Sequence, residues 1–187
     1  MIPIRNRKKT LKVTVEEMRN FAFAYIEKYA PSKQQLKTYL LKKYLKTSVP
    51  NVKKQDVNKL IEIVLSDLEK SKFINDKFYS ESKARSMISR GSSINKIRSY
   101  LLGKGIDENY INNTVDQIND QNSDQDFFSA IKICKKKRIG PARVEDNRPL
   151  FYKKDISLLA RNGFDFETSK KVMDMTEEEY KKIINLL

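Results

Sequence analysis

The chain has 187 residues, of which 39% are hydrophobic and 33% charged, and 38 Lys and Arg against 24 Asp and Glu give a net charge of +14. This excess of positive charge points to a polyanionic or acidic partner, with biased codon usage as the plainer alternative. The absence of His and the single Cys, Cys134, exclude a disulfide framework and Cys/His metal sites. Because no apolar run reaches the length of a membrane span and no signal peptide begins the chain, we expect a soluble, cytoplasmic protein.

The periodic segments are helical from one end of the chain to the other. Apolar residues from Met18 to Tyr29, and again from Val57 to Leu68, recur at helical spacing, and no segment alternates convincingly with period two. Thr14 with Glu17, Ser32 with Gln35 and Thr176 with Glu179 have the spacing of capping boxes. The sequence therefore predicts an all-α fold with helices at 15–30, 32–46, 53–72, 76–90, 93–104, 107–120, 124–138, 151–162, 165–174 and 176–187.

Two stretches, "LLGKGIDENYI" at 101–111 and "LARNGFDFET" at 159–168, share the order Gly, apolar residue, Asp. A Gly after a helix adopts the left-handed conformation that satisfies the last carbonyls, and an Asp caps the next helix. We therefore predict a positive φ at Gly105 and Gly163 and tight corners between helices. A phosphate-binding loop is disfavoured, because Lys104 lacks the following Ser or Thr.

The corners belong to an internal repeat. "YLLKKYL" at 39–45 matches "YLLGKGI" at 100–106 with a shift of 61, which also pairs Ser32 with Ser93. Units of this size bury little alone, so they are expected to stack on one another. The predicted organisation is a basic N-terminal arm, three three-helix repeats and a C-terminal helix, at 1–13, 14–72, 73–120, 121–175 and 176–187.

The middle repeat carries "FINDKFYSESKARSMISRG", "SINKIRSYLLGKGID" and "ENYINNTVDQI", and the third continues with "LLARNGFD". In this order of motifs the chain resembles the RecX family of regulators of the RecA recombinase. The resemblance implies tandem three-helix, helix-turn-helix-like repeats in an elongated, curved array. Two loops depart from the family pattern, "TSVPNVKKQD" at 47–56 and "IGPARVEDNRPLF" at 139–151.

The resemblance also implies a function in DNA recombination, DNA repair and the SOS response. The chain would dock along the groove of the RecA–single-stranded DNA filament and limit filament extension, ATPase activity and strand exchange. We expect a monomer that is not an enzyme and has no membrane partner, with single-stranded DNA as a candidate direct contact. No catalytic residue, cofactor or metal is expected. The alternative is an independent nucleic-acid-binding helical repeat protein, although no helix begins with the polar cluster of a reading helix.

Basic side chains in the second and third repeats are the candidate partner-binding or nucleic-acid-binding residues. A basic stripe could follow phosphates or an acidic protein surface, and a solvated helix face is the alternative for each of its members. The run "KKKR" at 135–138 also suits a helix C-terminus, but its proximity to Arg143 and Arg148 favours partner contact. The candidates are Arg85, Arg90, Lys96, Arg98, Lys104, Lys135, Lys136, Lys137 and Arg138.

Two further features are open to two interpretations. The segment "RNRKK" at 5–9 has the composition of a nucleic-acid-binding arm or of a solvated chain end. Tyr100 and Tyr110 lie on apolar stripes, which favours core packing over base stacking.

Overall fold

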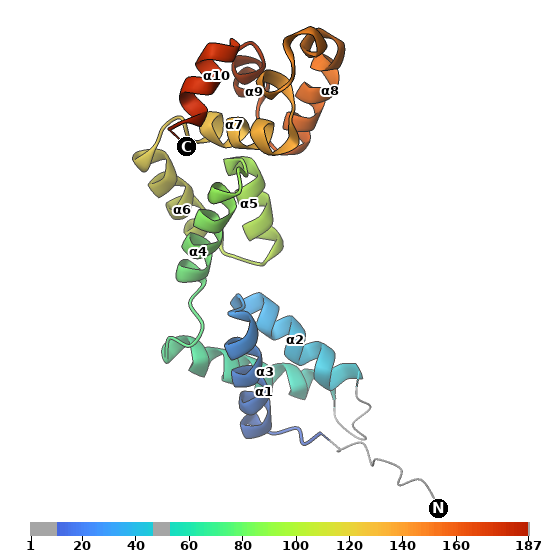
Figure 1. Ribbon diagram of the computed structural model, residues 1–187. Coiled ribbons are helices and arrows are strands. Elements are labelled where there is room, and N and C mark those ends of the chain that lie inside the picture. Colours follow the sequence, from blue (N-terminus) through green and yellow to red (C-terminus); the bar gives the residue numbers. More distant parts are fainter. Residues whose placement is uncertain (1–10, 47–52, 187) are drawn as a thin grey trace, which may run out of the picture. The chain divides into compact units, whose positions relative to one another are not determined.

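The computed structural model describes residues 11–46 and 53–186, and within these ranges every regular element is a helix (Figure 1). This confirms the predicted all-α fold class. The α-helices are α1 Val15–Tyr29, α2 Lys33–Lys46, α3 Lys54–Lys70, α4 Asp76–Ser89, α5 Ile94–Gly103, α6 Glu108–Gln121, α7 Gln125–Lys137, α8 Arg148–Arg161, α9 Phe166–Met173 and α10 Glu177–Ile184.

The start of α8 and the end of α10 each differ by three residues from the predicted boundaries. Helix α8 begins at Arg148 and not at 151, because Pro149 fits its first turn, where a missing backbone N–H costs nothing. The segment before it forms two short 3-10 turns, Gly140–Ala142 and Glu145–Asn147. Both turns lie within the loop at 139–151 that departs from the family pattern.

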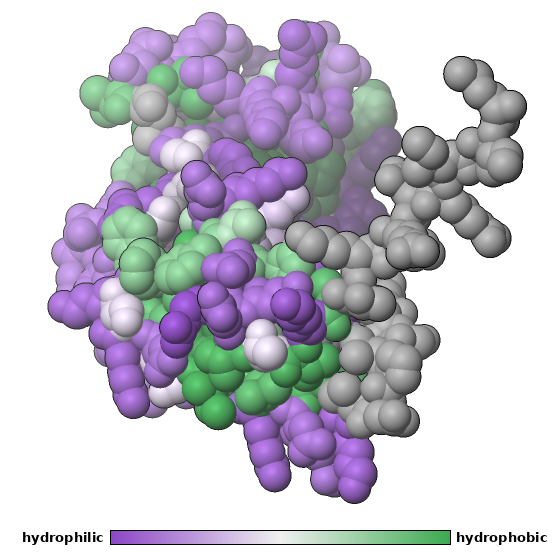
Figure 2. All heavy atoms as spheres, turned by 90° about the horizontal axis from the view of Figure 1, so that it is seen from below, coloured by the Kyte–Doolittle hydropathy of each residue, from purple (hydrophilic) through white to green (hydrophobic). Residues whose placement is uncertain are grey.

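The chain divides into two compact units, 1–79 and 80–187, with the boundary inside α4. In the N-terminal unit, α1, α2 and α3 pack around fully buried side chains such as Met18, Leu40 and Ile61. In the C-terminal unit a cluster that includes Ile131, Leu159 and Val172 joins α7, α8 and α9. Seen from below, apolar residues form a green patch within a mostly hydrophilic, purple surface (Figure 2).

Both predicted corners are present. Gly105 has φ 71° and Gly163 has φ 87°, and Asp107 and Asp165 cap the helices that follow. Gly163 has a second reason to be glycine, because a Cβ there would lie 2.5 Å from the Ser93 hydroxyl oxygen. The second corner therefore also fits closely against the start of α5.

Gly105→Ala should lower the free energy of unfolding by about 1 kcal/mol, the cost of left-handed backbone for a residue with a Cβ. Gly163→Ala should cost more, because its Cβ adds a steric clash with Ser93. Urea unfolding of the two variants measures this difference. Equal losses would contradict a close fit at the second corner.

Two helix starts, those of α2 and α5, are each hydrogen-bonded to an Asp side chain of a later helix. Asp76, at the beginning of α4, accepts a hydrogen bond from the Lys33 backbone N–H of α2 at 2.9 Å. Asp126, in the first turn of α7, accepts one from the Ile94 backbone N–H of α5 at 2.8 Å. The buried Ser32 and Ser93 each receive a backbone N–H at the same helix starts. The two contacts are of the same kind, and the donor residues Lys33 and Ile94 are 61 positions apart, as are Ser32 and Ser93.

Asp126→Ala should lower the free energy of unfolding by about 1 kcal/mol, the usual worth of a helix cap. The stabilisation that Asp126 provides is limited, because burial disfavours its charged form. Burial raises the pKa of Asp126, and the hydrogen bond from Ile94 offsets only part of that effect. Asp124→Ala is the matched control, because Asp124 is exposed and its side chain makes no cap hydrogen bond. Chemical denaturation compares the two, and an equal loss would show that the Asp126 contact contributes nothing.

The loop before α8 is anchored by a buried ion pair. The Arg143 guanidinium donates to both carboxylate oxygens of Asp155, from Nε at 2.6 Å and from NH2 at 2.9 Å. Asp155 is only 1% exposed and also accepts the Gly140 backbone N–H at 2.9 Å. Arg148 donates to the carbonyls of Pro141 and Met175. These contacts hold the loop in place and give Arg143 and Arg148 a structural role, while partner contact of the neighbouring basic run stays a prediction.

Candidate partner-binding groove

A basic groove of about 740 Å³ lies in the C-terminal unit, between the end of α4, the start of α5 and the end of α7. Five of its lining side chains are cationic and none is a carboxylate. The lining residues are Ser82, Lys83, Ser86, Met87, Arg90, Ser92, Lys96, Tyr100, Ile133, Lys136, Lys137 and Asn162.

The turn after α4 brings the three helices together. Gly91 has φ 81°, and a Cβ at this position would lie 3.0 Å from the Ser129 carbonyl oxygen and 3.2 Å from Ile133. The absence of a side chain therefore lets the α4–α5 turn lie directly on α7. As a result, cations of the second repeat face the basic end of α7.

The third repeat closes one side of the groove through the corner at Asn162. The Ser93 hydroxyl donates to the Asn162 carbonyl at 2.8 Å, and the Lys96 ammonium donates to the Asn162 side-chain oxygen at 2.9 Å. Asn95 donates to the Gly163 carbonyl at 3.2 Å. The "RNG" corner of the third repeat therefore positions Lys96 as well as turning the chain.

Arg90 lies just after α4 and is oriented by the last turn of that helix. Its Nε donates to the Ser86 carbonyl at 2.9 Å, and its NH2 donates to the Ser86 hydroxyl at 3.1 Å. The residue remains exposed, and the guanidinium has further N–H groups with which it can donate to a ligand. An arginine held in this way loses less side-chain entropy on binding a phosphate or carboxylate than one that moves freely.

The charge of the groove defines what it can bind. Five cations around one hollow without a lining carboxylate produce a positive potential that attracts anions. Arg90 can bind phosphate or carboxylate oxygens in pairs, and the lysines act as point charges around it. Phosphate groups and acidic protein surfaces are the two ligands that this chemistry fits.

The groove unites four of the predicted candidates, Arg90, Lys96, Lys136 and Lys137. It also contains Lys83, which the sequence analysis missed. Lys83 precedes Arg90 by seven residues, and the sequence predicts one helix over 76–90, so helical spacing alone would have placed both on one face. The remaining candidates do not line this groove.

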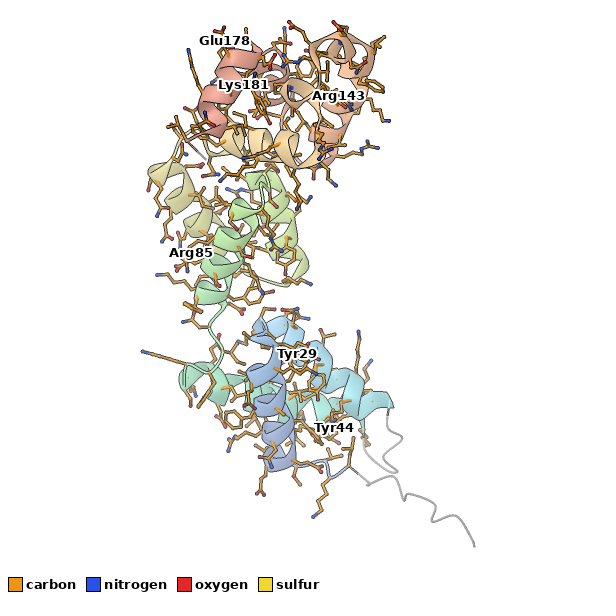
Figure 3. All side chains as sticks on the ribbon, viewed as in Figure 1. Tyr29, Tyr44, Arg85, Arg143, Glu178 and Lys181 are labelled. Atoms are coloured by element: carbon orange, nitrogen blue, oxygen red, sulfur yellow. The ribbon has the colours of Figure 1, made fainter. Side chains whose placement is uncertain are left out.

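Arg85 and Arg98 lie elsewhere on the C-terminal unit. Arg85, labelled in Figure 3, is 66% exposed and lies 3.9 Å from Glu81, a weak surface pair. Arg98 donates to the Asn112 side-chain oxygen at 2.7 Å and lines a smaller hollow between α5 and α6. The stripe expected along the middle repeat is therefore divided between different faces.

The other three candidates lie near the ends of helices. The Lys104 ammonium is 5.2 Å from the ring centre of Tyr100, which places it beside the groove. Lys135 is exposed on the last turn of α7, and Arg138 closes that helix in the left-handed conformation with φ 53°. The cations at the end of α7 complement the negative end of the helix dipole, which is the alternative explanation for the run "KKKR" at 135–138.

The two tyrosines differ from the core-packing prediction. Tyr110 is 40% exposed, and Tyr100 is half-buried with its ring in the wall of the groove. Their apolar stripes are completed by neighbouring Ile and Val residues, which leaves the tyrosines at the edge of the core. Tyr100 adds an aromatic surface to a cationic groove.

Cys134 is buried, and its thiol pKa is raised to about 12, first by burial and then by the charge of Asp155. Across residues 11–46 and 53–186 no three His, Cys, Asp or Glu side chains gather in a metal-binding cluster. No helix in these ranges is both long and apolar enough to cross a membrane. The arm segment at 5–9 and most of the loop at 47–56 lie outside the described residues.

No protein-family model matches the chain. Over 177 residues it is 30% identical to the regulatory protein RecX of Myxococcus xanthus (strain DK1622), and the aligned region covers 91% of each chain. The chain belongs to the RecX family. The regulatory protein RecX of Agrobacterium fabrum (strain C58 / ATCC 33970) is 26% identical over 167 residues, or 89% of this chain and 87% of the relative.

Solved RecX structures have a similar fold. RecX from Lactobacillus salivarius superimposes with a TM-score of 0.59 at 16% identity, over 92% of this chain and 97% of the other. A second crystal structure of a regulatory protein RecX gives a TM-score of 0.58 at 20% identity, over 86% and 74% of the two chains. The resemblance seen in the repeat motifs is therefore confirmed at the level of family and fold.

Proposed function

We propose that this RecX-family chain is a cytoplasmic, non-enzymatic regulator that binds the RecA–single-stranded DNA filament. It inhibits filament extension and thereby lowers ATPase activity and strand exchange during DNA recombination and repair in the SOS response. Membership of a family whose relatives are named regulatory proteins supports this role. The observation that carries the proposal is the groove with five cations and no lining carboxylate.

The groove explains how a protein without a catalytic site could act. Its cations come from helices of successive repeats, held together by the Gly91 turn and the Asn162 corner, so the charged surface is preorganised. It binds phosphates or acidic residues of the filament through several modest contacts. A monomer held in this way obstructs the addition of further recombinase subunits.

The second candidate function is nucleic-acid binding without the recombinase. The same groove favours it, because phosphates satisfy the same cations. Binding to naked single-stranded DNA would then weaken steeply with salt, since each neutralised phosphate releases counterions. The two functions differ in whether the recombinase is required.

A pull-down with the recombinase tests the proposal. The chain is incubated with RecA alone, with single-stranded DNA alone, and with RecA, DNA and nucleotide together. The proposal expects strong retention only when the filament is assembled. Equal retention on DNA with and without recombinase would favour the second function, and no retention in any mixture would contradict both.

A further inference from the structure

The N-terminal unit carries an aromatic row formed by Tyr39, Tyr25 and Tyr29. Tyr25 stacks on Tyr39 with ring centres 4.1 Å apart and an interplanar angle of 11°. Tyr29 follows at 4.8 Å from Tyr25, tilted by 46°. Tyr29 is 53% exposed at the end of α1, where Figure 3 labels it, so the row ends in an accessible ring.

Cations accompany these rings. The Lys28 ammonium is 5.2 Å from the ring centre of Tyr29, and the Lys43 ammonium is 5.8 Å from that of Tyr39. The second helix, α2, contains five lysines and no acidic residue. Lys33 and Lys37 pair with Glu69 and Glu62 of α3, whereas the ammonium groups beside the rings of the row belong to Lys28 and Lys43.

We propose that the aromatic row binds single-stranded nucleic acid, with a base stacked on the open ring of Tyr29 and flanking phosphates bound by Lys28 and Lys43. Every base has a face that stacks on an aromatic ring, and the backbone beside it requires cations. An apolar peptide would gain little here, because each ring of the row carries a hydroxyl and the ammonium groups of Lys28 and Lys43 lie beside the rings at its two ends. This site lies in the N-terminal unit and is separate from the groove in the C-terminal unit.

The test measures affinity for two oligonucleotides of equal length and charge, one of deoxythymidine and one abasic, with the full chain and no recombinase. The wild type should bind the base-bearing strand about tenfold more tightly, the usual gain from stacking one base. Tyr29→Leu should reduce this preference to near unity without changing abasic binding. Tyr29→Phe should retain the preference, and Tyr110→Leu, at an exposed tyrosine of the other unit, should leave it unchanged.

Three results would overturn the proposal: equal wild-type affinity for both strands, an unchanged preference in Tyr29→Leu, or an equal loss of both affinities in that variant. The comparison of wild-type affinity for the two strands needs no substitution, so it tests base stacking even if a variant folds poorly. The assay contains no recombinase. Its failure would therefore leave the proposed filament regulation standing. Conversely, a pull-down in which RecA adds nothing to the retention on single-stranded DNA alone would count against filament regulation and leave this site standing.

Discussion

Arg90→Glu combined with Lys136→Glu should abolish the effect of the chain on recombinase ATPase activity and strand exchange. The two residues enter the groove from the turn after α4 and from α7, so their reversal turns five positive charges into three positive and two negative ones. Charge reversal against an acidic or phosphate surface replaces attraction with repulsion. Both side chains are exposed, so each substitution should change the free energy of unfolding by less than about 0.5 kcal/mol.

Arg85→Glu combined with Arg98→Glu is the matched control. It reverses the same number of charges in the same unit, but neither residue lines the groove. The control should keep the wild-type effect on ATPase activity, measured at one salt concentration for all proteins. If both double variants lose the effect equally, overall charge and not the groove would be responsible.

Arg143→Met should lower the free energy of unfolding by about 3 kcal/mol, because it leaves the buried carboxylate of Asp155 without its partner. Figure 3 labels Arg143 on the C-terminal unit. Asp155→Asn in the same chain should restore part of the loss, since an amide is neutral and still accepts the Gly140 N–H. Urea unfolding of the single and double variants measures both effects. A loss below about 0.5 kcal/mol in Arg143→Met would contradict the anchoring role.

The same pair predicts a pH dependence. Burial raises the pKa of Asp155, but the hydrogen bonds from Arg143 and Gly140 outweigh it and leave the pKa below its ordinary value. The pair therefore stabilises the fold fully above the ordinary aspartate pKa, and this contribution is lost as the pH falls through the lower, folded value. In Arg143→Met burial is no longer balanced, so acidification below neutral pH should stabilise that variant relative to wild type. Unfolding free energies at several pH values test the sign.

The helices and corners were predictable because their signals are local. Capping spacings at Ser32 and Thr176 lead to reciprocal capping in the structure, and a Gly before an apolar residue and Asp turns the chain at 105 and 163. The start of α8 was misplaced because its preceding 3-10 turns depend on Asp155, fifteen residues after Gly140. A contact of that kind has no local sequence pattern.

The groove was predictable only in part for the same reason. Periodicity identifies exposed cations on each helix, but it does not show that Arg90 and Lys136 line one groove beside the Gly91 turn. Nor does it separate them from Arg98, which faces Asn112. The bond from Ser93 to Asn162 joins residues 69 positions apart, and no spacing rule predicts it.

Site-specific cross-linking tests most directly whether the groove contacts the filament. Cys134 is buried with a thiol pKa of about 12, so an introduced exposed cysteine can be labelled selectively with a photo-cross-linker. Ser82→Cys places the label in the groove, and Ser157→Cys places it at an exposed position on α8 outside the groove. With RecA, single-stranded DNA and nucleotide present, we predict cross-links to the filament from position 82 and none from position 157. Cross-links from position 157 alone, or equally from both positions, would contradict binding through the groove.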